Sequence, residues 1–354
     1  MTAPTTIRSM NVADLNIPLH TPFTTSYLLA HNLLVTIELA DGTRGYGEAA
    51  PVAGGAAQAQ ARAALSDLRS LIEGADVREW RRIAESLRSA IGQEGAARCA
   101  VETAVLDGLT RQARMPLWAF FGGASTSLET DMTIGGGSVE QASVAALDIV
   151  GRGIGTIKIR LSGDLAHALS CIVAVHAVAP EQSLILDGGG SFSADQALEL
   201  LGTLRLQGIK PILFEQPVPA DDWAGLEQIA AWGGVPVAID ESLNSLSDTL
   251  RLIFDRRAQV VNIKLMKSGI VEALDIVAVC RTAGLGLMIG STLESPLAIG
   301  AAACFAAGLG GFRFVDLDSP LFMVENPFVG GYQQRGGLID LTPITAGHGT
   351  IPRE

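Results

Sequence analysis

The sequence between residues 183 and 264 contains four short apolar segments that each end in a charged side chain: SLILDGG (183–189), ILFEQP (212–217), VPVAIDE (235–241) and VVNIKL (260–265). The charged residues follow one another at intervals of 28, 25 and 24 residues, and in chain order they are Asp187, Glu215, Asp240 and Lys264. One interval accommodates one strand, one covering helix and two loops, which predicts successive βα units. Because the segments are apolar without alternation, we expect strands that are buried on both faces of a parallel sheet.

The three carboxylates among these residues predict a metal site. When parallel strands close into a barrel, their C-terminal ends meet at one mouth, where the active sites of such barrels lie. A single strand-end carboxylate is more often a helix cap or a solvated charge. Three of them at successive strand ends repel one another unless a cation neutralises them. An all-oxygen ligand set suits Mg²⁺, so we expect Mg²⁺ bound by Asp187, Glu215 and Asp240.

Eight strand candidates extend this pattern in both directions. Amphipathic helical segments such as residues 194–208 separate them. The candidates are residues 131–134, 156–160, 183–189, 212–217, 235–241, 260–265, 286–292 and 312–318. This order predicts an α/β fold, a (β/α)8-type (modified TIM) barrel.

A second domain precedes the barrel. Residues 5–51 alternate between apolar and polar side chains like an antiparallel meander, and residues 54–122 have helical periodicity. We therefore expect an α+β domain over residues 1–124, the barrel over residues 125–325 and a Gly-rich C-terminal segment over residues 326–354.

Composition excludes several classes of function. The 354 residues carry 25 Lys and Arg against 37 Asp and Glu, a net charge of −12, which disfavours nucleic acid and anionic membranes as partners. The four cysteines have no CxxC spacing, and neither a signal peptide nor an uninterrupted apolar span is evident. We expect a cytoplasmic homo-oligomer with a small-molecule substrate.

The chain resembles the enolase superfamily through its strand-end Asp187 followed by FEQP (214–217), DES (240–242) and NIKLMKSG (262–269). Within that superfamily it is most similar to the muconate-lactonizing subgroup, and there to the dipeptide epimerases. GYGEAAP (45–51) and PLWAFFGG (116–123) are also similar to family motifs, although Glu48 alone could be a surface charge. The resemblance implies that the α+β domain caps the barrel mouth and that the C-terminal segment returns to the cap.

The resemblance also implies proton abstraction next to a carboxylate, with Lys264 as the base. A rigidly held lysine near other cations has a lowered pKa, as this chemistry requires. The family has Lys-x-Lys on the second barrel strand, whereas this chain has Lys158-Ile159-Arg160. Arg160 then faces Lys264 but stays protonated, and Lys158 provides an electrostatic contact. Gly189 stands where the family commonly has the Asn of Asp-x-Asn.

The eighth strand ends in Asp316-Leu317-Asp318, and the resembled epimerases bind the substrate α-ammonium with an Asp-x-Asp at this place. Carboxylates at i and i+2 leave the same face of a strand, so both can contact one cation. Glu294 could instead be a loop charge, and the loop 20–31 offers no Lys or Arg for an acidic substrate side chain. The remaining expected substrate contacts are Thr133, Ser291, Leu293 and Glu294.

These features predict a Mg²⁺-dependent isomerase, a racemase or epimerase that acts on an L-Ala-X type dipeptide. The alternatives are a one-base cycloisomerase or lyase, including one similar to o-succinylbenzoate synthase, an N-acylamino-acid racemase, and a catalytically silent binder. Arg160 favours the one-base alternatives, because epimerisation needs a proton-exchanging group on each face of the substrate. We therefore expect α-hydrogen exchange through Lys264 with slow net inversion.

Overall fold

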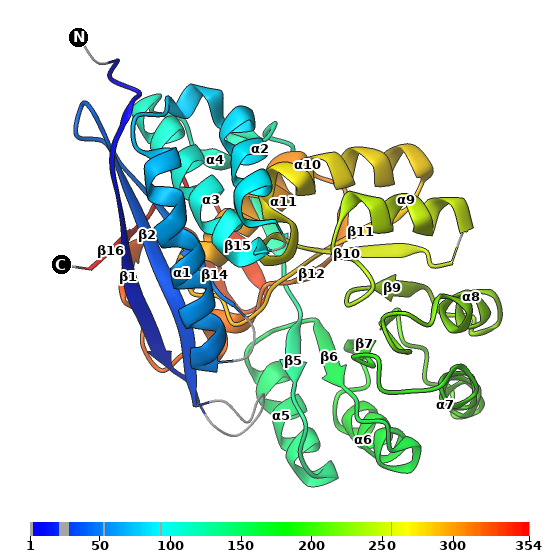
Figure 1. Ribbon diagram of the computed structural model, residues 1–354. Coiled ribbons are helices and arrows are strands. Elements are labelled where there is room, and N and C mark those ends of the chain that lie inside the picture. The colour runs from blue at the N-terminus through cyan, green and yellow to red at the C-terminus, as the bar shows by residue number, and fades with distance from the viewer. Residues whose placement is uncertain (1–2, 21–27, 52–53, 93, 256, 354) are drawn as a thin grey trace.

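The computed structural model describes residues 3–20, 28–51, 54–92, 94–255 and 257–353, and it shows a sheet-and-helix unit beside a ring of parallel strands (Figure 1). The first unit contains an antiparallel sheet in the order β1-β2-β3, as the alternating sequence predicts. Its strands are β1 (Ile7–Pro18), β2 (Leu29–Leu39) and β3 (Arg44–Ala49). Its helices are α1 (Gly54–Ile72), η1 (Val77–Glu79), α2 (Trp80–Ile91), α3 (Gly95–Gln112) and α4 (Leu117–Phe120).

Helix α3 lies between the antiparallel sheet of the first unit and the barrel, and most of its residues are buried. It packs directly on β3 because that strand has glycine at positions 45 and 47. A Cβ atom at Gly45 or Gly47 would collide with the backbone of α3 at Ala104 or Ala100. The other side of α3 packs on helix α10 (Leu265–Ala283) of the barrel, so α3 connects the sheet of the first unit to the barrel.

The second unit is the predicted eight-stranded parallel barrel with helices outside it. All eight strand candidates form strands, and their spatial order follows the sequence. The strands are β5 (Met132–Ile134), β6 (Thr156–Arg160), β7 (Ser183–Asp187), β8 (Leu213–Glu215), β9 (Val237–Ile239), β10 (Val260–Lys264), β11 (Gly286–Gly290) and β12 (Phe312–Asp316). The helices are α5 (Val139–Gly151), α6 (Leu165–Val178), α7 (Ala194–Leu206), α8 (Trp223–Trp232), α9 (Leu246–Asp255), α10 (Leu265–Ala283) and α11 (Pro296–Leu309).

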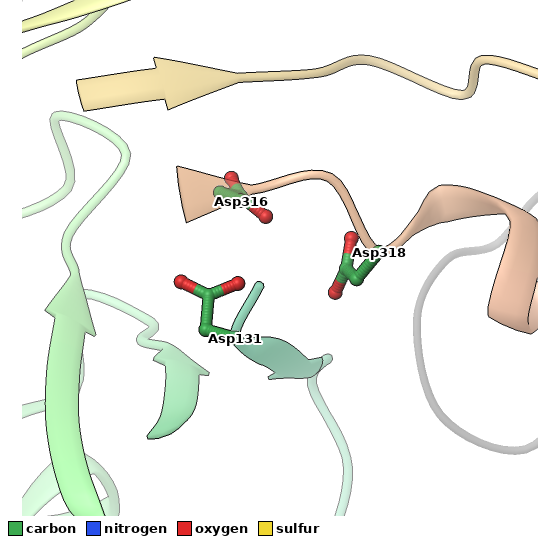
Figure 2. Close-up of side chains that lie close together, drawn as sticks. All are labelled: Asp131, Asp316 and Asp318. Atoms are coloured by element: carbon green, nitrogen blue, oxygen red, sulfur yellow. The ribbon is translucent and has the colours of Figure 1, made fainter. Parts of the chain in front are cut away.

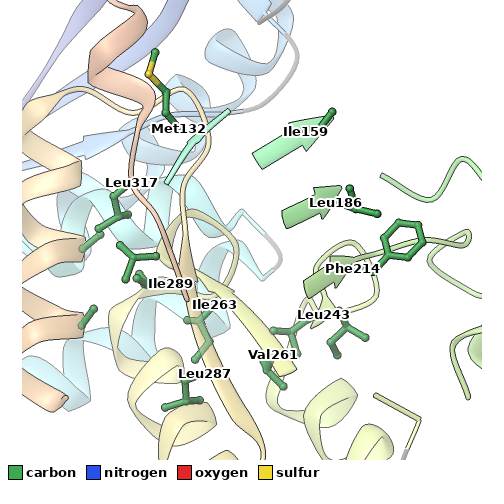
Figure 3. Packing of buried hydrophobic residues seen from close by; sticks show 14 of the residues in the cluster. Met132, Ile159, Leu186, Phe214, Leu243, Val261, Ile263, Leu287, Ile289 and Leu317 are labelled. Carbon is green, nitrogen blue, oxygen red and sulfur yellow. The ribbon is translucent and has the colours of Figure 1, made fainter. Parts of the chain in front are cut away.

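The barrel core has two layers that follow the alternation of strand side chains. Outward-facing residues such as Ile159, Leu186 and Phe214 pack under the helices (Figure 3). A separate cluster joins one residue from each of six strands: Ile185, Leu213, Ala238, Val260, Met288 and Phe314. Two positions further along their strands, the charged Asp187, Glu215 and Asp240 have the same inward direction. The charged side chains at the barrel mouth therefore lie next to this apolar cluster, which fills the barrel interior.

The barrel closes between β5 and β12, the two ends of the hydrogen-bonded strand order. The segment before β5 lies beside the end of β12. The Asp131 amide donates to the Val315 carbonyl at 2.9 Å, and the Leu317 amide donates to Thr130 Oγ1 at 2.8 Å. Side chains from the start of the first barrel strand thus lie next to side chains from the end of the last one.

After β12 the chain forms η2 (Ser319–Phe322). The C-terminal segment then contributes four short strands, β13 (Phe328–Gly330), β14 (Gln333–Arg335), β15 (Leu338–Asp340) and β16 (Thr350–Pro352). β13 pairs with β16, and β15 joins β14 to β4 (Ser127–Glu129). The segment contacts the first unit, since the His348 amide donates to Asp107 and Arg111 donates to the Thr350 carbonyl. In the described part of the chain, every helix is too short or too polar to span a membrane.

Candidate active site

A pocket of about 350 Å³ opens at the C-terminal ends of the barrel strands. Nine of the twelve site residues expected from the sequence line it: Thr133, Lys158, Arg160, Asp187, Lys264, Ser291, Leu293, Asp316 and Asp318. Glu215 and Asp240 lie beneath the pocket wall and are almost fully buried. The barrel therefore gathers basic and acidic side chains from six strands around one cavity.

The three expected metal ligands occupy neighbouring strand ends. Asp187 and Glu215 are register partners on β7 and β8, and Asp240 follows β9 directly. In the described residues they do not form a group whose ligand atoms all lie within 4.8 Å of one another. Lysine ammonium groups provide neutralising charge instead: Lys158 bridges Asp187 and Glu215, and two further lysines contact Asp240.

Lys158 is the central cation of this cluster. Its Nζ lies 3.1 Å from Asp187 Oδ2, 2.8 Å from Glu215 Oε2 and 2.7 Å from Asp316 Oδ2. Burial by itself lowers the pKa of Lys158, but the surrounding carboxylates outweigh it and raise that pKa well above its usual range. Lys158 therefore links the expected metal ligands to the aspartates of β12 as a protonated group.

Lys264 has a simpler environment on the opposite side of the barrel mouth. Its Nζ lies 2.7 Å from Asp240 Oδ2, while Lys267 Nζ lies 3.0 Å from Asp240 Oδ1. Burial opposes the charge of Lys264, but Asp240 and Glu215 raise its pKa, so the lowered pKa expected from the sequence is wrong for these surroundings. Burial likewise raises the pKa of Asp240, and Lys264 and Lys267 outweigh this effect and lower it. Asp240 is thus ionised and has two lysine partners.

The chemistry of the carboxylates fits Mg²⁺. All three donors are oxygens on adjacent strand ends, and the four nearby cations supply the charge that a divalent ion would supply. Burial, as the largest effect, raises the pKa of Glu215 to about 8, although Lys158 lowers it. Glu215 Oε2 makes no hydrogen bond of regular geometry despite its 2.8 Å contact with Lys158. Such a buried, incompletely paired oxygen is well suited to a metal.

Two buried amides position these ligands, and the sequence analysis missed both. Asn262 Nδ2 donates to Glu215 Oε1 at 2.8 Å. Gln216, at a positive φ of 34°, accepts hydrogen bonds from the Asp240 and Ser242 amides at 3.0 and 3.1 Å. The Gln of FEQP therefore fixes the turn that carries Asp240. No signal in a single sequence separates such a residue from an ordinary loop amide.

Arg160 and Gly189, the two departures from the family pattern, lie next to each other. Arg160 Nη1 contacts Asp187 Oδ2 at 2.8 Å, and its side chain is 45% exposed at the mouth. Gly189 has a φ of +50°, and a Cβ atom there would collide with the Arg160 guanidinium. Burial lowers the pKa of Arg160, but Asp187 outweighs it, so the pKa is raised. Gly189 thus makes room for a permanent cation beside Asp187.

Asp316 and Asp318, which line the pocket, lie beside Asp131, a buried residue outside the pocket lining that the sequence pattern did not indicate (Figure 2). Asp318 Oδ2 accepts a hydrogen bond from the Thr133 amide at 2.7 Å, so Thr133 positions Asp318 through its backbone. Asp131 precedes β5, whereas the other charged residues of the site lie at the C-terminal ends of strands. The stagger between the first and last strands brings it beside the end of β12.

The loop after β11 forms the side of the pocket nearest the first unit. Ser291 Oγ donates to the Asp316 carbonyl at 3.0 Å. Glu294 does not line the pocket, because its buried carboxylate accepts from the Thr292 amide at 2.8 Å. Burial raises the pKa of Glu294 to about 8. Among the residues of the expected loop 20–31, positions 21–27 lie outside the described residues.

Glu48 connects the first unit to this loop and is buried, so it is not a surface charge. Its Oε1 accepts from the Ser295 amide at 2.9 Å and from Asn32 Nδ2 at 2.6 Å. Asn32 Nδ2 also donates to the Leu293 carbonyl at 2.7 Å. The family motif around Glu48 therefore has a local purpose, since it holds the pocket loop against the sheet of the first unit.

Comparison with known proteins gives two family matches and close relatives. Residues 4–122 match the mandelate racemase/muconate lactonizing enzyme N-terminal domain, and residues 141–354 match the enolase C-terminal domain-like family. An aromatic dipeptide epimerase of Herpetosiphon aurantiacus is 46% identical over 98% of this chain and 99% of the relative. A hydrophobic dipeptide epimerase of Citrifermentans bemidjiense is 33% identical over 95% of both chains.

Solved structures agree with these matches. A mandelate racemase/muconate lactonizing enzyme from Roseiflexus sp. superposes with a TM-score of 0.95 at 59% identity, covering 100% of both chains. A dipeptide epimerase from Enterococcus faecalis, complexed with Mg and the dipeptide L-Leu-L-Tyr, superposes with a TM-score of 0.93 at 28% identity. That comparison covers 98% of this chain and 99% of the other.

Proposed function

Because the chain belongs to the mandelate racemase/muconate lactonizing enzyme family of the enolase superfamily, we propose that it is a Mg²⁺-dependent epimerase of L-Ala-X type dipeptides. One observation carries this proposal: Lys264, the β6 cations and the Asp316/Asp318 pair line one pocket together with Asp187, and Glu215 and Asp240 are buried at the adjacent strand ends. The pocket thus offers a base for the α-proton and an anionic contact for the N-terminus.

Asp187, Glu215 and Asp240 are the residues that would hold the metal. When bound, Mg²⁺ supplies positive charge next to the substrate carboxylate, where negative charge develops as the α-proton leaves. Asn262 and Gln216 keep Glu215 and the Asp240 turn in place by hydrogen bonds. The ligand positions are therefore fixed by the fold.

Lys264 moves the α-proton on one face of the substrate. It ends β10 with its ammonium inside the pocket, so its position is set by a buried strand. Removal of a proton by a positioned side chain requires hydrogen-bond reach and a pKa near the working pH. Lys264 lines the pocket, and its proton depends on one principal carboxylate, Asp240.

The side chains of β6 lie on the other face of the substrate, opposite Lys264. Arg160 stabilises negative charge as a fixed cation but cannot accept a proton. Lys158 is the other basic group of β6 in the pocket wall, so we assign it the proton transfer on this face. Its proton is held by three carboxylates, and this face is therefore the slower one.

The substrate amino terminus binds at Asp316 and Asp318. Both carboxylates line the pocket. The positive charge of a substrate ammonium group balances their negative charge through charged hydrogen bonds, whereas a neutral amide carries no such charge. Free dipeptides are therefore substrates, and N-acylated amino acids are poor ones. Efficient racemisation of N-acetyl or N-succinyl amino acids would instead assign the protein as an acylamino-acid racemase.

Incubation with dipeptide libraries and Mg²⁺ in D₂O, read by mass spectrometry, tests the proposal. We expect deuterium at the α-carbon of the second residue together with epimerisation, and loss of both with EDTA. Tight binding without exchange would identify a silent binder. Exchange without any inversion would favour the one-base alternative, which Arg160 supports.

We also propose a homo-oligomeric state and a cytoplasmic location. Light scattering coupled to gel filtration tests the first, with a particle mass above the 36.9 kDa of one chain as the expected result. Cell fractionation tests the second.

A further inference from the structure

Three carboxylates meet where the barrel closes. Asp131 comes from the segment before β5, Asp316 ends β12 and Asp318 follows it (Figure 2). One oxygen from each lies within 4.8 Å of the other two. Their residues are only 2%, 4% and 5% exposed, so water does not separate these charges from one another.

Asp131 lacks a partner. Both of its carboxylate oxygens are buried and make no hydrogen bond, whereas Asp316 pairs with Lys158 and Asp318 accepts from Thr133. The Asp131 amide is fixed to the Val315 carbonyl at 2.9 Å, which keeps this residue in place at the closure. A buried carboxylate without a partner is costly, and a cation removes that cost.

The geometry suits an ammonium group. For three points no more than 4.8 Å apart, one position lies within about 2.8 Å of all of them, a normal N–H···O distance. A primary ammonium has three N–H donors, one for each carboxylate. Burial, followed by the charges of Asp316 and Asp318, raises the pKa of Asp131 well above its usual range, as expected for a carboxylate without its cation.

We propose that Asp131 is the third carboxylate of the substrate-ammonium site, which accepts one N–H from a primary ammonium at each of Asp131, Asp316 and Asp318. This inference rests on the proposed dipeptide substrate and deepens it, because it specifies a primary amine. An N-methyl ammonium has only two N–H donors, so one buried carboxylate stays unpaired. N-methylated dipeptides are therefore discriminated against by Asp131 in particular.

Kinetics with L-Ala-X and N-methyl-L-Ala-X dipeptides, for the wild type and Asp131→Asn, test the assignment. In the wild type we expect kcat/KM to fall by about tenfold or more on N-methylation, since a charged hydrogen bond is lost. In Asp131→Asn we expect a KM for the free dipeptide raised by about tenfold and a much smaller N-methyl penalty. Glu129→Gln, an equal change of charge on the exposed strand β4, leaves both values unchanged.

An N-methyl penalty and KM that are the same in Asp131→Asn and wild type would overturn the assignment. A crystal of the wild type soaked with a dipeptide provides a test that needs no variant. We expect an Asp131 oxygen within about 3.2 Å of the substrate nitrogen. A separation beyond hydrogen-bond reach, or a Mn²⁺ anomalous peak between the three aspartates, would also overturn it. A wild type that turns over no dipeptide counts against the proposed function, and the soak still tests Asp131.

Discussion

The two basic walls of the pocket hold their protons in different ways. On the β10 side, Lys264 contacts one carboxylate, Asp240, which it shares with Lys267. On the β6 side, Lys158 contacts three carboxylates, and Arg160 adds a guanidinium that stays protonated. The comparison teaches that residue type alone does not make a base, because the number of acidic partners decides how readily a lysine releases its proton.

The two walls also differ in their support. Glu102 of α3 accepts a hydrogen bond from the Val271 amide at 2.9 Å, and Gly269, at a φ of 73°, leaves room for its carboxylate. The first unit thus braces the helix that begins directly after Lys264. On the β6 wall, the partly exposed Arg160 is held by charge, through Asp187 and the more distant Glu241.

Removal of the β10 base should have the largest effect. We expect Lys264→Ala to reduce inversion by about 10²–10⁴-fold and to abolish exchange of the epimer whose α-hydrogen faces β10, since Lys264 is the proposed proton carrier on that face. ¹H NMR of a dipeptide in D₂O measures both processes. The exposed Lys210→Ala serves as the control and should behave as wild type. Persisting exchange of the β10-facing epimer in Lys264→Ala would show that Lys264 is not the base on that side of the pocket.

Replacement of the β6 lysine should separate the two processes. We expect Lys158→Met to reduce inversion by about 100-fold while exchange through Lys264 continues, because only one face loses its proton carrier. Since the change also leaves three buried carboxylates without their shared cation, the melting temperature should fall without Mg²⁺ and recover with it. Equal losses of exchange and inversion would show that Lys158 acts on both faces.

Conversion of the β6 arginine should have a smaller, opposite effect. We expect Arg160→Lys to speed inversion by up to about tenfold, because lysine can exchange a proton where arginine cannot. Arg160→Met, which removes the cation and adds no base, is the matched control and should slow inversion. The rate of optical rotation change follows both variants, and a slower Arg160→Lys enzyme would mean that the guanidinium itself is needed.

Glu102, which supports the helix after Lys264, should make the free energy of unfolding depend on pH. Its titration should have little effect on activity. Burial, as the largest cause, raises the pKa of Glu102 to about 7 from 4.5. The folded protein then binds a proton that the unfolded chain has released, so this contribution is present below about pH 4.5 and is lost as pH rises through about 7. Between these values the wild type should lose stability relative to Glu102→Gln, as urea unfolding at several pH values would measure. A constant difference would contradict the assignment.

The sequence predicts the barrel well because its signals are local. Each apolar run from residues 131–134 to residues 312–318 became a strand, and a strand's alternation determines which side chains point inward. Asp187, Glu215, Asp240 and Lys264 lie two or four positions from inward-facing apolar residues. Their place at the mouth therefore follows from the pattern.

The rest of the site depends on relations across the fold that no local pattern contains. Asp131 lies beside Asp316 and Asp318 only through the stagger at the barrel closure. Arg160 and Gly189 are neighbours because β6 pairs with β7 in a register that sets Arg160 opposite Asp187. The Glu48 bond to Ser295 joins the two units, 247 residues apart in sequence. These contacts could therefore be identified only from the structure and could not be predicted from the sequence.

The central claim is that the β10 side of the pocket exchanges a proton more readily than the β6 side. Its most direct test is to measure α-hydrogen exchange for each epimer of one dipeptide separately in D₂O. One epimer presents its α-hydrogen to Lys264 and should exchange several-fold faster than it inverts. The other presents it to β6 and should exchange no faster than it inverts. Rapid inversion with equal exchange of both epimers would contradict the account.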